Sequence, residues 1–141
     1  MLGLGLSIPM AGAGRGTGRS GSPAFASGAL SFNGNVVDAE TVTIGATVYR
    51  YVTVLAQAYD VLIGGTASQT ILNHIAAVNG AAGEGTVYGT GTVAHPSVTA
   101  SSVPGKMNVT AKVAGPAGNA IATTSTSVTA TWGAATLQGG A

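Results

Sequence analysis

The sequence contains no cysteine and very little charge. Without cysteine the chain has no disulfide, no thiolate zinc ligand and no cysteine nucleophile. Charged residues make up 6% of the 141 residues, whereas a soluble domain usually carries about 25%. A soluble monomer with so few charges tends to associate with itself. We therefore expect neighbouring subunits to cover much of the surface.

The balance of the charges excludes further classes of protein. The net charge is +1, so there is no basic patch of the kind that binds nucleic acid, and we expect no nucleic-acid partner. No run of 18 consecutive apolar residues occurs, and we expect no membrane insertion. Intrinsic disorder combines low hydropathy with high charge. Here the mean hydropathy is +0.42, which favours a folded chain.

Residues 1–35 differ in composition from the rest of the chain. They consist mainly of Gly, Ala, Ser and Pro, and the stretch 11–23 has neither a helical nor a strand period. Leu2, Leu4 and Leu6 alternate with other residues, so an extended backbone places them on one side, where they suit an apolar groove. We predict an extended Gly-rich assembly arm that anchors on other subunits; the alternative is a mobile leader. The predicted anchor residues are Leu2, Leu4, Leu6, Ile8, Arg15 and Arg19.

From residue 36 the pattern changes to short strands and one helix. Thr66-Ala-Ser-Gln69 matches a helix capping box, Ile71, Ile75 and Val78 recur at helical spacing, and Gly80 is a typical helix stop. These signals predict a helix over about 67–79. Residues 42–44 and 47–54, separated by Gly45-Ala46, predict a hairpin with a two-residue turn. Further strands are predicted at 61–63, 92–101, 106–113 and 127–132.

These elements predict the α+β fold class, with β dominant. Residues 36–141 are expected to form a compact module. It consists of a small, mainly antiparallel sheet or sandwich and one amphipathic helix, and the extended N-terminal arm precedes it.

Motifs that carry chemistry in other proteins lack their context here. Residues 16–21 match G-x-G-x-x-G by letter, but a dinucleotide site needs a strand before this motif and a helix after it. No G-x-S-x-G elbow accompanies the serines, although a catalytic triad depends on geometry that spacing does not give. The two histidines and four acids show no metal-ligand spacing; they are His74, His95, Asp38, Glu40, Asp60 and Glu84. We predict no catalytic residue, no cofactor and no metal, and a protein that is not an enzyme.

The aromatic residues are candidates for contacts with other molecules. Tyr49, Tyr51 and Trp132 are candidate interface residues. Aromatic rings also stack on sugars, so these residues together with Tyr88 could line a carbohydrate platform. Scattered aromatic residues more often pack in a core or between subunits, and packing is the favoured interpretation.

Six runs of residues in the body carry a family resemblance. They are 43–52, 61–64, 76–79, 88–98, 109–124 and 131–137, so the likeness covers about residues 40–140. Together they resemble a small module of tailed-bacteriophage virion proteins, and the leader Leu2-Gly-Leu-Gly-Leu6 resembles leaders of small phage structural proteins. The resemblance implies a non-enzymatic part of the particle, of the fibre, collar, baseplate or capsid-decoration type. Arg50 and the long arm depart from the pattern.

We therefore expect a non-enzymatic structural component of a tailed-phage virion, anchored by its arm in a tail or neck appendage or as capsid decoration. The expected partners are other virion structural proteins and further copies of this chain. The expected location is the virion, assembled in the bacterial host cytoplasm. The alternative is a host-glycan or receptor-binding module of a phage fibre.

Overall fold

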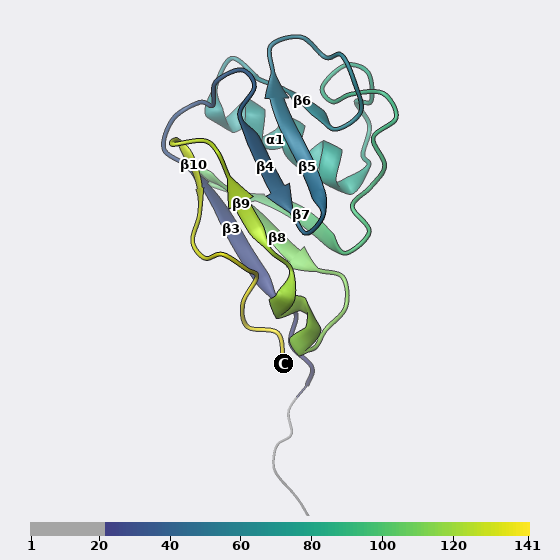
Figure 1. Ribbon diagram of the computed structural model, residues 1–141, viewed down its shortest axis with the longest axis vertical. Helices are drawn as coiled ribbons and strands as arrows, with labels where there is room; N and C mark the ends of the chain where they lie inside the picture. Colours follow the sequence, from purple (N-terminus) through teal and green to yellow (C-terminus); the bar gives the residue numbers. More distant parts are fainter. Residues whose placement is uncertain (1–21) are drawn as a thin grey trace, which may run out of the picture.

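The computed structural model describes residues 22–141, and Figure 1 shows how their elements are arranged. The elements are eight strands, one α-helix and one short 3-10 helix. In chain order they are β3 (Ser27–Phe32), β4 (Thr41–Ile44), β5 (Thr47–Val52), β6 (Asp60–Leu62), α1 (Ala67–Asn79), β7 (Val98–Val103), β8 (Lys106–Ala111), η3 (Pro116–Ala120), β9 (Thr123–Ser125) and β10 (Ala130–Trp132).

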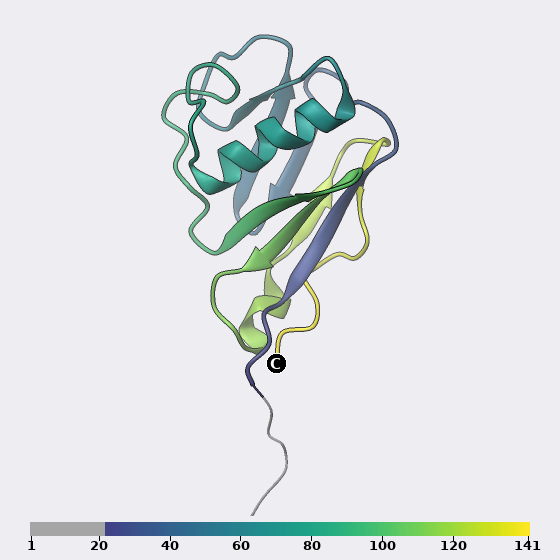
Figure 2. The same cartoon turned by 180° about the vertical axis from the view of Figure 1, so that it is seen from behind.

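The strands form two four-stranded sheets, in the orders β10-β3-β8-β7 and β6-β5-β4-β9. Neighbouring strands are antiparallel except β5 and β6, which run parallel. The sheets face each other, since the rings of Phe32 in β3 and Tyr51 in β5 meet edge to face with centroids 6.3 Å apart. α1 contacts β6 of one sheet and β7 and β8 of the other, and Figure 2 shows it lying across them. The predicted α+β class with β dominant is confirmed.

α1 begins and ends where the sequence predicts. The hydroxyl of Thr66 accepts a hydrogen bond from the backbone N–H of Gln69 at 3.1 Å, and Gly80 ends the helix in the left-handed conformation with φ 64°. The reciprocal bond of a capping box is absent, because the Gln69 side chain donates to Asn73 Oδ1 instead. The helix buries apolar and polar side chains together: Thr70, Ile71, Asn73, His74, Ala77 and Val78.

The predicted hairpin is also confirmed. Ile44 pairs with Thr47 across Gly45-Ala46. Gly45 has φ 61° and Ala46 has no positive φ, the pattern of a type II′ turn, in which only the first central residue is left-handed. β5 ends at Val52, two residues before the predicted end.

The predicted boundary between arm and body at residue 35 is wrong. Residues 27–32, which the sequence assigned to the arm, form β3, a strand paired with both β8 and β10. Leu30 of this strand is fully buried. The strand was missed because Ser, Gly and Ala are weak strand formers. Gly28 packs closely here, since a Cβ would lie 3.0 Å from Leu137 Cδ2. The body therefore includes β3, while residues 1–21 lie outside the described residues.

Gly89→Ala is expected to destabilise the fold. A Cβ at this position would overlap the carbonyl oxygen of Gln57, so one of the two backbones would have to move. Overpacking of this kind costs about 1–3 kcal/mol. Gly65→Ala is the matched control, because nothing lies within 4 Å of a Cβ there. Denaturant unfolding measures both variants, and equal stabilities would contradict the packing of residue 89 against residue 57.

Candidate functional site

The predicted anchor residues all lie outside the described residues; they are Leu2, Leu4, Leu6, Ile8, Arg15 and Arg19. The structure does show where the first described residues join the body. Ala24 N–H donates to the carbonyl of Ala141 at 2.9 Å, and Ala141 N–H donates back to Ala24 at 3.2 Å. Gly115 N–H also donates to the Ala24 carbonyl. Residues 24, 115 and 141 therefore meet at one end of the body, the lower end in Figure 1, which we call the end face.

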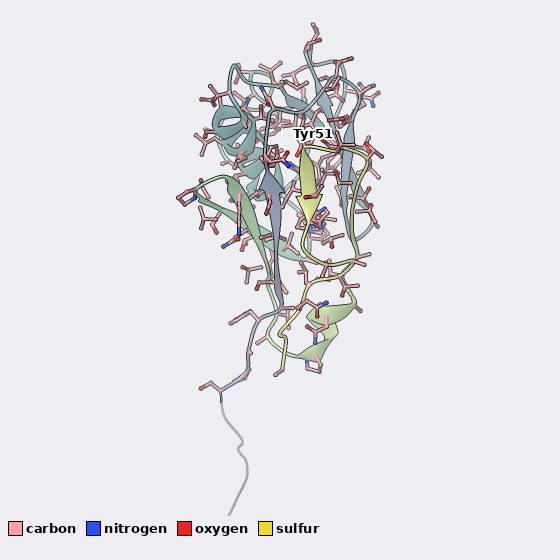
Figure 3. The ribbon with its side chains drawn as sticks, turned by 90° about the vertical axis from the view of Figure 1, so that its left-hand side faces the viewer. Tyr51 is labelled. Atoms are coloured by element: carbon pink, nitrogen blue, oxygen red, sulfur yellow. The ribbon has the colours of Figure 1, made fainter. Side chains whose placement is uncertain are left out.

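Two of the three candidate interface aromatics lie in the core. Tyr49 and Tyr51 are both fully buried within one chain, and Figure 3 labels Tyr51 inside the molecule. Both rings pack against the ring of His74. The Tyr49 ring also contacts that of Tyr59, and the Tyr51 ring contacts that of Phe32. The prediction that they serve as interface residues is therefore wrong, because no surface of theirs is left for a partner. Both faces of β5 carry large side chains, so its sequence alone did not show which face is buried.

His74 binds this aromatic cluster to α1. Its Nδ1 lies 2.7 Å from the Tyr51 hydroxyl. The Tyr51 hydroxyl has no other hydrogen-bond partner among residues 22–141, and the tautomer of the His74 ring decides which of the two groups donates. Neither Nε2 nor the Tyr49 hydroxyl has a hydrogen-bond partner. Burial lowers the pKa of His74 to about 3 and raises the pKa of both tyrosines far above the ordinary value. The cluster is therefore neutral and structural at pH 7.

Trp132 is the candidate aromatic that keeps an exposed face. Its indole N–H donates to the carbonyl of Thr124 at 3.0 Å, and its ring lies next to Gly28. It lines a shallow groove of about 320 Å³, the Trp132 groove, with Thr123, Thr124, Ser125, Ser127, Thr131, Ala134 and Ala135. Several of these hydroxyls bond within the chain, as Ser125 does to the Ala130 carbonyl. The groove thus offers one aromatic edge and few free polar groups.

Arg50 and Asp60 form an ion pair across the parallel strands β5 and β6. Arg50 Nε donates to Asp60 Oδ1 at 3.0 Å, and Arg50 Nη2 donates to Oδ2 at 3.1 Å. Asp60 is fully buried and also accepts from the backbone N–H groups of Ala56 and Gln57. The pair fixes the loop before β6, so the charge at residue 50 has a structural use.

The remaining histidine and acids are also engaged within the chain. His95 is buried, with Nε2 2.9 Å from the Ile44 carbonyl and Nδ1 accepting from Ser97 N–H. Asp38 accepts from Thr53 N–H, and Glu84 accepts from Gly91 N–H. Within residues 22–141 no three His, Asp or Glu side chains gather as a metal site would require. No helix in this part of the chain is long and apolar enough to cross a bilayer.

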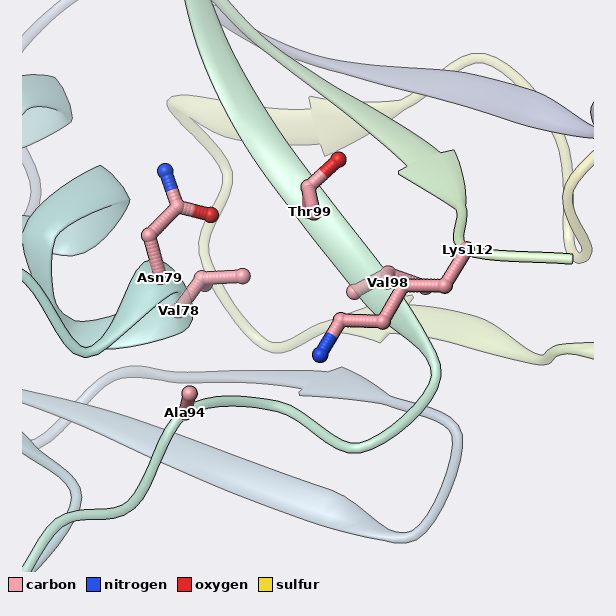
Figure 4. Close-up of a pocket in the computed structure, with 6 residues that line it drawn as sticks. All are labelled: Val78, Asn79, Ala94, Val98, Thr99 and Lys112. Atoms are coloured by element: carbon pink, nitrogen blue, oxygen red, sulfur yellow. The ribbon is translucent and has the colours of Figure 1, made fainter.

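A hollow of about 160 Å³ lies at the C-terminal end of α1 (Figure 4). Val78, Asn79, Ala94, Val98, Thr99 and Lys112 line it. The side-chain amide of Asn79 is hydrogen-bonded within the chain, because its NH2 group donates to the Ala100 carbonyl and its oxygen accepts from the Ala100 N–H. These two bonds satisfy backbone groups on the outer edge of β7 and so protect an edge strand from pairing with another chain.

A more apolar groove of about 230 Å³ lies near the end face. We call it the Val113 groove; its lining is Ser97, Ala111, Val113, Ala117, Gly118 and Ile121. Val113 is 74% exposed. The sequence does not reveal this groove, since the alternation in 106–113 indicates only a strand with one buried side. The exposed valine at the end of that strand was the one available signal.

Comparisons of the chain with protein-family models, with curated proteins and with solved structures found no match.

Proposed function

We propose that this chain is a non-enzymatic structural component of a tailed-phage virion, held in a multi-subunit assembly through its N-terminal residues. Its partners are other structural proteins of the particle and further copies of the chain itself. The tail or neck and the capsid surface are the two candidate locations.

The observation that carries the proposal is the composition of the exposed surface. Eight large apolar side chains are about half exposed or more: Phe25, Val37, Val48, Val54, Leu72, Val93, Val113 and Val128. Against them, residues 22–141 contain seven charged residues, of which Arg50 and Asp60 neutralise each other. Charge keeps proteins apart in solution, and exposed apolar groups favour burial against partners. This surface suits a protein that works inside an assembly.

The end face supports the same proposal. The chain enters the body from residues 1–21 at the end where Ala141 also lies. A body held through its N-terminal residues therefore projects from its attachment with the α1 end outward. This geometry suits a module displayed on a particle, and the resemblance of residues 40–140 to a phage virion module supports that kind of particle.

Removal of residues 1–21 tests the proposal. We expect the shortened chain to be lost from purified particles while its body stays folded, because β3 and the core are retained. Incorporation is measured by mass spectrometry of particles, and folding by circular dichroism. A variant with Arg15→Gln and Arg19→Gln serves as control, separating the contribution of charge from that of the apolar residues. Normal incorporation of the shortened chain would contradict the proposed anchoring.

A second candidate function is recognition of a host glycan, favoured by the exposed edge of Trp132 in its groove. With Tyr49 and Tyr51 buried, this function falls to Trp132 and the neighbouring hydroxyls. It predicts saturable binding of the body to host cells that Trp132→Ala weakens by about 1–3 kcal/mol, the contribution of one stacked ring. Equal binding by the variant, or no binding by either protein, would rule this function out.

A further inference from the structure

No side chain of residues 22–141 fills the Val113 groove. Ala111 at its base is buried, while Val113 at its rim is 74% exposed. Ser97 is its one polar lining residue. At about 230 Å³ the groove is larger than the roughly 150 Å³ apolar cavity that holds a benzene molecule. It therefore has room for a leucine side chain.

The groove lies beside the point where the chain enters the body. Ala26 accepts a hydrogen bond from Ala111 N–H, and Ala24 accepts one from Gly115 N–H. Both bonds attach the start of the described chain to the segment that lines the groove. The described part of the chain therefore begins next to the groove.

The chain contains a segment whose chemistry fits the groove. Residues 2–8, which we call the Leu segment, carry Leu2, Leu4, Leu6 and Ile8, and no charged residue precedes Arg15. In an extended backbone alternate residues share one side, about 6.6 Å apart, so successive leucines present one apolar row. Such a row matches a groove lined by alanine, valine and isoleucine.

We propose that the Leu segment of one copy binds in the Val113 groove of a neighbouring copy. This inference rests on the proposed function and names the contact that would hold the assembly. Residues 9–21 connect the Leu segment to the body of its own copy. Thirteen residues span up to about 45 Å when extended, which exceeds the roughly 35 Å breadth of a body this size.

Docking on a neighbour accounts for more of the surface than docking on the same chain. Exchange brings two end faces close and shields Phe25, which is 52% exposed, as well as Val113. A segment that folds back covers its own groove and leaves the rest of the apolar surface in water. Reciprocal exchange between two copies closes a two-fold dimer, whereas one-way docking from copy to copy builds a ring or a longer array.

Disulfide trapping tests the inference on the full chain, which has no cysteine of its own. One copy carries Leu4→Cys, and a second copy of different mass, extended by a tag, carries Val113→Cys. The two are mixed and mildly oxidised. A disulfide requires Cα atoms about 4.4–6.8 Å apart, so we expect a mixed dimer band. The matched control is Val54→Cys, because Val54 is 75% exposed and follows Val52, the end of β5 away from the Gly45 turn, which lies near Ile121 of the groove. We expect about tenfold less mixed dimer with this control.

Three results would overturn the inference. The first is no excess of mixed dimer over the Val54→Cys control. The second is a chain carrying both Leu4→Cys and Val113→Cys that closes within one monomer, which would mean docking on its own groove. The third is an unchanged average mass for Val113→Glu, since a buried charge in the groove should reduce association of the full chain. If trapping fails while removal of residues 1–21 still prevents incorporation, the groove is wrong and the proposed function stands.

Discussion

Arg50→Met is expected to lower the free energy of unfolding by about 3 kcal/mol. The substitution keeps the apolar stem and leaves the carboxylate of Asp60 buried without its cation. Removing one partner of a buried pair typically costs about 3–5 kcal/mol. Arg50 is 38% exposed, and water screens part of its charge, so the lower end of the range applies here. The backbone N–H groups of Ala56 and Gln57 still bind the carboxylate and limit the loss.

Two further variants make this result specific to the ion pair. Lys106→Met makes the same chemical change at an exposed position and is expected to alter stability by less than about 0.5 kcal/mol. Adding Asp60→Asn to Arg50→Met removes the unpaired buried charge and is expected to recover part of the loss. Urea unfolding at pH 7 measures all three. If Arg50→Met and Lys106→Met are equally stable, the pair does not hold β5 and β6 together.

The second large effect is a loss of stability in acid that His74 causes. The folded protein keeps the pKa of His74 at about 3, whereas the ordinary value is 6.5. As pH falls below 6.5 the unfolded chain binds a proton that the folded chain excludes, so stability is full above pH 6.5 and falls toward pH 3. The slope from this single group is about 1.4 kcal/mol per pH unit. The Tyr49 and Tyr51 rings that face His74 are neutral over this range and offer the imidazolium no counter-charge.

His74→Gln isolates this contribution from that of the carboxylates. The variant is less stable at pH 7, because Tyr51 loses its hydrogen-bond partner on the ring, but its stability should fall less steeply between pH 6 and pH 4. We expect the difference in slope to be about 1 kcal/mol per pH unit. Parallel slopes for the two proteins would show that His74 takes up its proton without unfolding the chain.

The elements that the sequence predicted well are those with strong local signals. α1 has a threonine cap at one end and a glycine stop at the other, and the β4–β5 turn has glycine at its left-handed position. β3 and β9 lack such signals, because SGALSF and TTS consist largely of small or hydroxyl residues. Their place in the sheets comes from pairing with strands far along the chain, as Ser27 pairs with Thr110.

The candidate site was less predictable than the fold for the same reason. The end face depends on hydrogen bonds of Ala24 with Gly115 and Ala141, which lie far from it in the sequence, and no local pattern encodes such contacts. Tyr49 and Tyr51 alternate with Val48, Arg50 and Val52, so either face of β5 was a reasonable choice for the core. Packing against His74 and Phe32 decided it. Trp132 is half-buried at the end of a short strand, which left its ring partly exposed.

Quantitative mass spectrometry of purified particles tests the central claim most directly. A structural component is present at a fixed copy number in every preparation, in a small symmetric set for an appendage or in hundreds of copies for capsid decoration. Because apolar burial rather than charge holds it, a high-salt wash should not remove it. The proposed function predicts a constant copy number that survives this wash. Absence from the particles, or a variable amount that salt removes, would contradict it.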